Sequence, residues 1–204
     1  MTELLSDQIY ENIINGIITG NISQATILTQ SQLSEDYDVS ISPVREALTR
    51  LCCEGILYSI PRYGYKIKLV DSKYYSEISN LRLILEPEYL NKYFDSITDV
   101  DIQTIRKTTL VFSQDIAKNP VIYWKKTSGF HLALAYAYRD EFFYDELSSI
   151  LNKQLITFSQ LYWNKWTASL PYRLIDNHSD VINSIEEKDK ERAIFLLRQD
   201  IKSF

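Results

Sequence analysis

The stretch SISPVREALTRLCCEGILYSIPRYGYKIKLV, residues 40–70, decides how the N-terminal part of this chain is expected to fold. Its first half has the apolar spacing of a helix with one buried face, formed by Val44, Leu48 and Leu51. We expect Ser42 to cap the start of this helix, Pro43 to take its first position and Gly55 to end it. The pattern thus predicts one helix with two well-marked ends.

The apolar pattern changes after this helix from a helical period to strand-like alternation. Residues 56–60 and 65–70 are predicted to be strands, and the PRYG between them is typical of a tight turn. Upstream, residues 7–19 have helical apolar spacing, and a short helix is predicted from a cap at Thr29 to about Asp38. Three helices followed by a two-stranded hairpin predict a winged helix-turn-helix.

The rest of the chain has helical patterns almost throughout. Glycine and proline number only 5 each among 204 residues, which favours long helices over turn-rich β structure. Helices are predicted over residues 73–94, 99–117, 121–138, 141–165, 171–187 and 189–202. We therefore predict a mainly α protein with an N-terminal winged helix-turn-helix domain, residues 1–71, and a C-terminal antiparallel helical bundle, residues 72–204.

Charge is unevenly distributed along the chain. The formal net charge is −5, which excludes a protein that is basic over its whole surface. Residues 41–68 nevertheless carry five cations against two carboxylates, and a local positive face is enough to bind phosphates. Near the start of the predicted helix and along the hairpin, the candidates for DNA contacts are Ser40, Ile41, Ser42, Arg45, Arg62 and Lys66. The alternative for Arg45 and Arg50 is a solvated helix face without a ligand.

Neither a membrane-spanning run nor a secretory signal is found in the sequence. The two cysteines, Cys52 and Cys53, are adjacent on a predicted helix. Their geometry there is unfavourable for a disulfide, and their spacing is not that of a metal-binding motif. We expect them to be small apolar residues in a reducing compartment, and therefore a cytoplasmic protein with no membrane partner.

The segment LSEDYDVSISPVREALTRLCCEGILYSIPRYGYKI, residues 33–67, resembles the DNA-binding domain of GntR-family transcriptional regulators. It is close to the family signature S-x-S-P-V-R-E-A-L-x-R-L-x-x-E-G. The resemblance implies DNA contacts from Ser40, Ser42, Arg45, Arg50 and a wing made by Arg62, Tyr63 and Gly64. The family usually has an arginine at the position of Ile41, where an isoleucine could contact a thymine methyl group instead. A different operator preference is therefore expected.

Three later segments resemble the FadR-like branch of this family, whose second domain is an all-helical FCD-type domain. They are RLILEP (residues 82–87), FHLALAYAYRDEFF (130–143) and NHSDVINSIEEKDKERAIFLLRQDI (177–201). The resemblance then covers the whole chain. It implies that residues 72–204 bind a small-molecule effector and form a homodimer.

In many relatives of this branch, an aspartate and a histidine one helical turn apart join two further histidines around a divalent metal, which can bind a carboxylate effector. In this chain His131 and His178 match two of the histidines, whereas Thr127 replaces the aspartate and Asp200 replaces the last histidine. Two imidazoles and one carboxylate remain, a set that suits zinc, nickel or manganese. An organic ligand without metal, or no ligand, are the alternatives.

Arg82 is the candidate cation for an effector carboxylate, because a guanidinium can donate two parallel hydrogen bonds to a carboxylate. Its alternative is an ion pair with Glu86, four residues further along the same predicted helix.

These patterns favour a cytoplasmic, homodimeric, DNA-binding repressor that has no catalytic residues and whose operator affinity responds to an effector. Two alternatives belong to other classes. One is a small helical metalloenzyme that uses His131, His178 and Asp200. The other is an adaptor whose winged domain binds protein. Neither explains the basic hairpin as simply as duplex DNA does.

Overall fold

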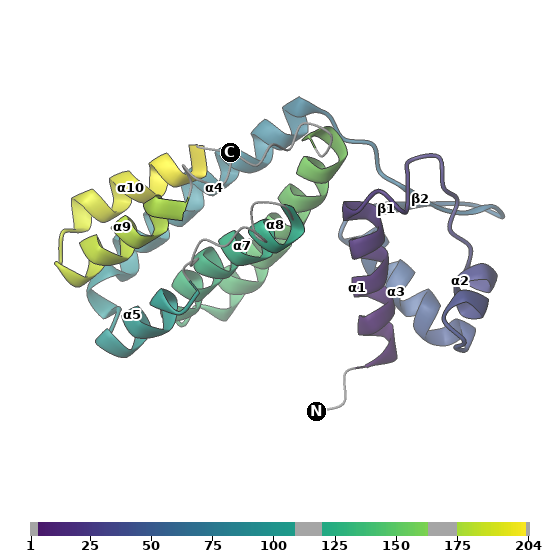
Figure 1. The fold of residues 1–204 in the computed structure, drawn as a ribbon, viewed down its shortest axis with the longest axis horizontal. Helices are drawn as coiled ribbons and strands as arrows, with labels where there is room; N and C mark the ends of the chain where they lie inside the picture. The colour runs from purple at the N-terminus through teal and green to yellow at the C-terminus, as the bar shows by residue number, and fades with distance from the viewer. Residues whose placement is uncertain (1–3, 109–119, 163–174, 203–204) are drawn as a thin grey trace. The chain divides into compact units, whose positions relative to one another are not determined.

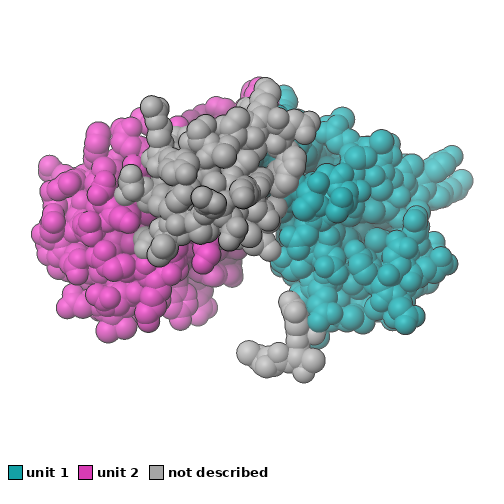
Figure 2. Space-filling view, viewed as in Figure 1, with its two compact units in different colours: residues 1–71, 155–161 teal, residues 72–154, 162–204 magenta. Residues whose placement is uncertain are grey.

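The computed structural model describes residues 4–108, 120–162 and 175–202 (Figure 1). Figure 2 colours two compact units separately, residues 1–71 with 155–161 and residues 72–154 with 162–204. Within the described ranges, no helix combines the length and the apolar character needed to cross a lipid bilayer.

Three helices and a hairpin make up most of the first unit. In chain order they are α1 (Leu5–Ile18), α2 (Gln30–Asp36), α3 (Ile41–Cys53), β1 (Leu57–Ile60) and β2 (Gly64–Ile67). The two strands are antiparallel, with Ile60 opposite Gly64 beside the turn. Leu28, in the segment before α2, adds a bridge to Tyr65. The predicted winged helix-turn-helix is confirmed.

The core of this unit lies between α1 and α3. Val44, Leu48 and Leu51 on α3 are fully buried, and α1 contributes a row of buried isoleucines that includes Ile9 and Ile13. Burying each such side chain contributes about 1.5–3 kcal/mol. Since this face is committed to the core, the opposite face of α3 is presented to solvent.

The start of α3 differs from the prediction. The helix begins at Ile41, with Ser40 in the cap position, so the prediction that Ser42 caps it was wrong. The chain reverses early, because Asp38 adopts a left-handed backbone with φ 52°. Pro43 then lies in the first turn, where the missing amide hydrogen has no intrahelical acceptor to lose.

Two other predicted helix ends are confirmed. The backbone N–H of Gln32 donates to Thr29 Oγ1 at 3.2 Å, so Thr29 caps α2 as predicted. Gly55 follows α3 with φ 71°, a left-handed conformation that favours glycine at a helix C-terminus.

The second unit is helical throughout its described part. Its elements are α4 (Ser72–Tyr93), the short 3-10 helix η1 (Phe94–Ser96), α5 (Asp99–Arg106), α7 (Pro120–Ala137), most of α8 (Glu141–Tyr162), α9 (Ile175–Glu186) and α10 (Lys190–Lys202). Helices α9 and α10 form an antiparallel pair that packs on α4 and α5 (Figure 1). The predicted helices are confirmed, except that α5 ends at Arg106 and that residues 109–117, 163–165 and 171–174 lie outside the described residues.

One apolar core connects these helices. Phe94, Phe130, Leu134, Val181 and Leu197 are among its buried members and come from η1, α7, α9 and α10. Buried polar side chains from α4, α7, α9 and α10 lie beside this core.

Candidate functional site

The first turn of α3 and the hairpin present the residues predicted to contact DNA. Ser40, Ser42 and Arg45 are exposed, and Ile41 keeps 45% of its surface accessible. Arg45 Nε lies 3.5 Å from Gln30 Oε1, and Gln30 Nε2 donates to the Tyr65 hydroxyl at 2.8 Å. Helix α3, helix α2 and the wing are therefore linked by polar contacts beside the exposed arginine.

The tip of the hairpin has an unusual backbone. Arg62 adopts φ 70° and Tyr63, which is 71% exposed, donates its backbone N–H to the Ile60 carbonyl at 3.0 Å. Gly64 adopts φ 134°, and a Cβ atom there would lie 2.3 Å from the Leu28 carbonyl oxygen. A glycine is therefore required for the wing to reach its bridge with the preceding segment. Lys66, opposite Tyr58 on the strand pair, is half-buried.

Arg50 has a different environment from Arg45. Its guanidinium lies 3.1 Å from Asp7 and 3.1 Å from Glu54, and 4.0 Å above the ring of Tyr10. The Tyr10 hydroxyl donates to Glu54 at 2.6 Å, and burial together with this carboxylate raises the pKa of Tyr10. Arg50 thus connects α1 with α3 through contacts that do not depend on DNA.

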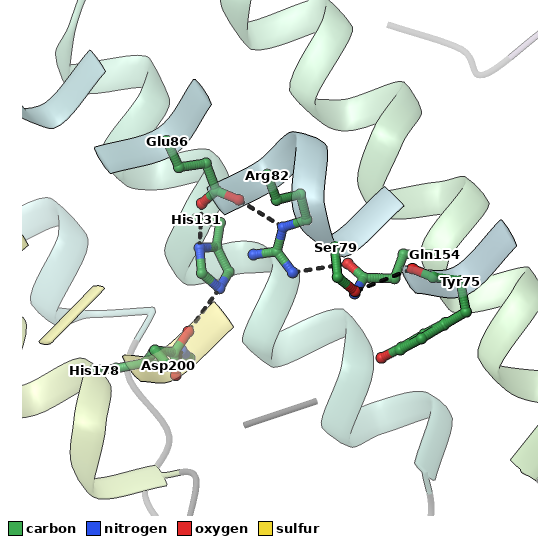
Figure 3. Close-up of polar contacts among 8 residues, drawn as sticks. All are labelled: Tyr75, Ser79, Arg82, Glu86, His131, Gln154, His178 and Asp200. Carbon is green, nitrogen blue, oxygen red and sulfur yellow. Dashed lines mark hydrogen bonds and ion pairs between the residues drawn. The ribbon is translucent and has the colours of Figure 1, made fainter. Parts of the chain in front are cut away.

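The second unit contains a cluster of buried polar side chains from α4, α7, α9 and α10 (Figure 3). Arg82, Glu86, His131, His178 and Asp200 are each no more than 3% exposed. His131 Nε2 lies 3.1 Å from Asp200 Oδ2, and His178 Nε2 lies 3.2 Å from Asp200 Oδ1. On the other side of its ring, His131 Nδ1 lies 2.6 Å from Glu86 Oε2. Arg82 Nε donates to Glu86 Oε1 at 2.5 Å.

Opposing effects set the ionisation of this cluster. Burial alone would raise the pKa of Glu86, but the charges of Arg82 and His131 and their hydrogen bonds lower it to about 2. Burial also opposes charge on Asp200, and the two imidazoles outweigh it and lower the pKa of Asp200. Burial lowers the pKa of both histidines; the negative charge of Glu86 reverses this effect for His131, whereas the pKa of His178 stays lowered.

Three of these residues fit a divalent cation. Ligand atoms of His131, His178 and Asp200 all lie within 4.8 Å of one another. The contacts to Asp200 are short but lack the alignment of a hydrogen bond, so both Nε2 atoms and both carboxylate oxygens have no hydrogen-bond partner among the described residues. Buried polar atoms are rarely left in this state, and two imidazoles with one carboxylate suit zinc, nickel or manganese.

Comparisons with known proteins identify the family. A family model described as bacterial regulatory proteins, gntR family, matches residues 5–67, and the FCD domain model matches residues 77–203, which is more than half of the chain. The chain is a GntR-family transcriptional regulator with an FCD domain.

Relatives of this regulator include the gluconate operon transcriptional repressor of Bacillus subtilis (strain 168). It is 26% identical over 203 residues, which cover 90% of this chain and 76% of the relative. The gluconate operon transcriptional repressor of Bacillus licheniformis is 24% identical over 202 residues, with the same coverage. Family membership favours a DNA-binding regulator over the metalloenzyme and the adaptor.

Solved structures show the same fold. E. coli McbR/YncC has a TM-score of 0.81 with 18% identity, covering 98% of this chain and 95% of that chain. Lar, which controls the expression of the Listeria monocytogenes agr system, has a TM-score of 0.65 with 16% identity, covering 99% of this chain and 95% of that chain.

In this GntR-family regulator, the structure brings together most of the predicted effector residues. His131, His178 and Asp200 converge, and Arg82 is two contacts away from them through Glu86. Thr127 is buried one helical turn before His131, and its hydroxyl oxygen has no hydrogen-bond partner in the described part of the chain. The predicted alternative for Arg82, an ion pair with Glu86, is present.

Sequence reasoning missed two members of the cluster. Glu86 was considered only as a partner of Arg82, and its hydrogen bond to His131 was not foreseen. Gln154 on α8 is fully buried and accepts from Arg82 Nη1 at 2.7 Å. A carboxylate four residues after a buried arginine is a weak signal for the first, and the sequence offers no signal for the second.

Proposed function

We propose that this regulator is a homodimeric repressor with a metal-dependent effector site. The protein would be cytoplasmic, and its residues 1–71 would bind a DNA operator. Residues 72–204 would hold a divalent cation through His131, His178 and Asp200. The proposal of an effector site rests on one observation: the ligand atoms of these three buried side chains lie close together and have no hydrogen-bond partner among the described residues.

The DNA-reading surface is proposed to combine the start of α3 with the wing. The exposed Arg45 can read guanine or contact phosphate, and the accessible Ile41 offers an apolar contact for a thymine methyl group. Hydroxyls and free amides at the helix start contact phosphates. The remaining contacts are assigned to Ser40, Ser42, Arg62, Tyr63, Gly64 and Lys66. Arg50 is given a supporting role, since its guanidinium is already held between two carboxylates.

The effector site is proposed to take a monocarboxylate. With neutral imidazoles, Arg82, Glu86 and Asp200 together carry one net negative charge. A bound divalent cation supplies two positive charges and open coordination positions for a ligand oxygen. The buried cluster then has one positive charge in excess, which one carboxylate neutralises. Arg82 Nη2, buried and without a hydrogen-bond partner among the described residues, is a second donor for it.

The names of the relatives are consistent with this class of effector. Two of them are repressors of gluconate operons, and gluconate is a sugar acid with a single carboxylate. Sugar acids and other small hydroxy monocarboxylates are therefore the first candidates for this chain.

The effector would act by shifting the equilibrium between dimers that can bind the operator and dimers that cannot. Two recognition helices of a dimer read half-sites about one turn of DNA apart, which requires a particular separation of the two winged domains. A ligand that binds more tightly to dimers with another separation lowers operator affinity by its difference in affinity for the two states.

The experiment is an operator selection followed by an effector titration. Duplexes enriched from a random pool by the purified protein are used in fluorescence anisotropy at several salt concentrations, with nickel or zinc and with a panel of sugar acids. We expect a pseudo-palindromic site whose affinity changes with a monocarboxylate only when metal is present. Binding that is independent of DNA sequence at every salt concentration would contradict the proposed operator recognition. An effect of the monocarboxylate on DNA affinity that persists in the presence of chelator would contradict the proposed role of the metal.

A further inference from the structure

His131 uses its two ring nitrogens on two different sides. Nε2 faces Asp200, and Nδ1 lies 2.6 Å from Glu86 Oε2 (Figure 3). Glu86 is not part of the group whose ligand atoms converge, which consists of His131, His178 and Asp200. Glu86 therefore lies on the side of the His131 imidazole that faces away from the candidate metal position.

The direction of the hydrogen bond between Glu86 and His131 follows from the second oxygen of the carboxylate. Arg82 Nε donates to Glu86 Oε1 at 2.5 Å, and both side chains are buried. A carboxylate paired with a guanidinium at this distance stays ionised and can only accept hydrogen bonds. The proton of the short bond therefore belongs to His131 Nδ1, and whenever the ring is neutral the lone pair is on Nε2.

Arg82 is itself held in a single orientation. Its Nη1 donates to Gln154 Oε1 at 2.7 Å, which turns the amide nitrogen of Gln154 toward Ser79 Oγ at 3.2 Å. Ser79 in turn donates its hydroxyl to the carbonyl of Tyr75 at 3.1 Å. A guanidinium has no acceptor and a backbone carbonyl has no donor, so every bond between them has one possible polarity.

We propose that Glu86 is a positioning residue that holds His131 in the Nδ1–H tautomer, so that Nε2 is available to a divalent cation. The proposal rests on the proposed metal site. In this arrangement Arg82 is bound to Glu86 and Gln154, and its Nη2, which has no hydrogen-bond partner among the described residues, remains available to an effector. Carboxylate or carbonyl partners behind metal-binding imidazoles commonly set tautomer and ring orientation in this way, and removing them weakens metal binding about 10–100-fold.

The decisive variant is Glu86→Gln. A glutamine amide can donate to Nδ1, which moves the ring proton to Nε2 and blocks the ligand atom. Because the chain contains only two histidines, a ¹⁵N-histidine-labelled sample gives two pairs of ring-nitrogen signals, and a His178→Phe variant assigns them. The tautomer is read from ¹⁵N shifts in metal-free protein at a pH where the ring is neutral. Zinc and nickel affinities are measured by competition with a chromophoric chelator.

We expect the wild type to carry its His131 proton on Nδ1. Glu86→Gln should carry it on Nε2 and bind zinc about 10–100-fold more weakly. Glu88→Gln, the same substitution at an exposed position of the same helix, should retain both the tautomer and an affinity within about twofold. A wild-type proton on Nε2, or a Glu86→Gln variant with unchanged tautomer and affinity, overturns the proposal.

Two further outcomes separate this proposal from the function on which it rests. If the wild type takes up neither metal, the metal site of the proposed function is wrong, while the tautomer still decides the role of Glu86. If Glu86→Gln fails to fold because Arg82 loses its counter-charge, Glu86→Asp replaces it. Aspartate remains an acceptor, so the Nδ1–H tautomer should persist, and a switch to Nε2–H in that variant contradicts the proposal.

Discussion

His178 Nε2 on α9 and Asp200 Oδ1 on α10 lie 3.2 Å apart in the core of the helical unit, yet they do not form an aligned hydrogen bond. The antiparallel pairing of these two helices brings them together across 22 residues of sequence. A buried imidazole and a buried carboxylate whose facing atoms have no hydrogen-bond partner among the described residues are available to bind a cation.

Asp200→Asn tests this pair. The substitution removes the carboxylate from the ligand set, so we expect the metal-dependent rise in thermal stability to disappear. In the wild type this rise should reach about 2.7 kcal/mol at a metal concentration 100 times the Kd. Thermal unfolding with nickel and with chelator measures it. Asp180→Asn, at an exposed position on α9, is the control and should behave as the wild type. An equal nickel effect in both variants would remove Asp200 from the site.

Arg45→Ala should weaken specific operator binding by about 1–3 kcal/mol and relax the base preference at one position of each half-site. Its side chain is exposed, so the free energy of unfolding should change little. Anisotropy on matched and base-substituted duplexes, together with urea unfolding, provides both numbers. Unchanged discrimination between those duplexes would exclude Arg45 from base reading.

Arg50→Ala, in contrast to Arg45→Ala, should lower the stability of the fold and leave DNA specificity largely unchanged. Its guanidinium is half exposed but stacks on Tyr10 between Asp7 and Glu54, so its loss should lower the unfolding free energy by about 1 kcal/mol. The ratio of specific to non-specific DNA affinity should be largely retained. A loss of that ratio as large as for Arg45→Ala would place Arg50 in the reading surface instead.

Gly64→Ala should destabilise the wing. A Cβ atom would lie 2.3 Å from the Leu28 carbonyl at a backbone φ of 134°, a strain of about 1–3 kcal/mol if the hairpin keeps its conformation. Gly129→Ala on α7 is the matched control. Nothing lies within 4 Å of a Cβ added there, so the better helix former should stabilise by about 0.5–1 kcal/mol. Urea unfolding compares them, and equal effects of the two substitutions would contradict the assigned backbone role.

Asp101 should contribute stability that is lost in acid. Burial raises its pKa, but hydrogen bonds from Arg139 and Thr98 outweigh burial and lower it. The unfolded chain therefore takes up this proton first as the pH falls below about 4. The stabilisation is present above that pH and is lost as the pH falls through the lower pKa of the folded protein. Asp101→Asn should lower the free energy of unfolding by about 1 kcal/mol at pH 7 and reduce the further loss of stability in acid, as measured by urea unfolding at a series of pH values.

The sequence predicts the elements better than it predicts their polar partners. The change of apolar period after Gly55 and the turn at PRYG are local signals, and they were sufficient for the winged fold. The start of α3 was placed two residues too late because Ser40 and Ser42 are equally good capping residues. Which one caps depends on where the preceding turn closes, and that is set by the backbone at Asp38.

The same distinction holds for the candidate site: its metal-binding residues could be predicted from the sequence, whereas the hydrogen-bond partners around them could not. His131, His178 and Asp200 could be named from the family resemblance, and the structure brings them together. The hydrogen bond from His131 to Glu86 spans 45 residues and that from Arg82 to Gln154 spans 72. Such contacts depend on how α4, α7 and α8 pack, and no pattern within a single helix encodes them.

Anomalous scattering from crystals of the purified protein tests the central claim most directly. Data collected on both sides of the nickel and zinc absorption edges should give one peak per protomer, bonded to His131 Nε2, His178 Nε2 and a carboxylate oxygen of Asp200. Crystals grown with excess metal that contain no peak between these atoms, with each imidazole instead aligned in a hydrogen bond to Asp200, would contradict the account.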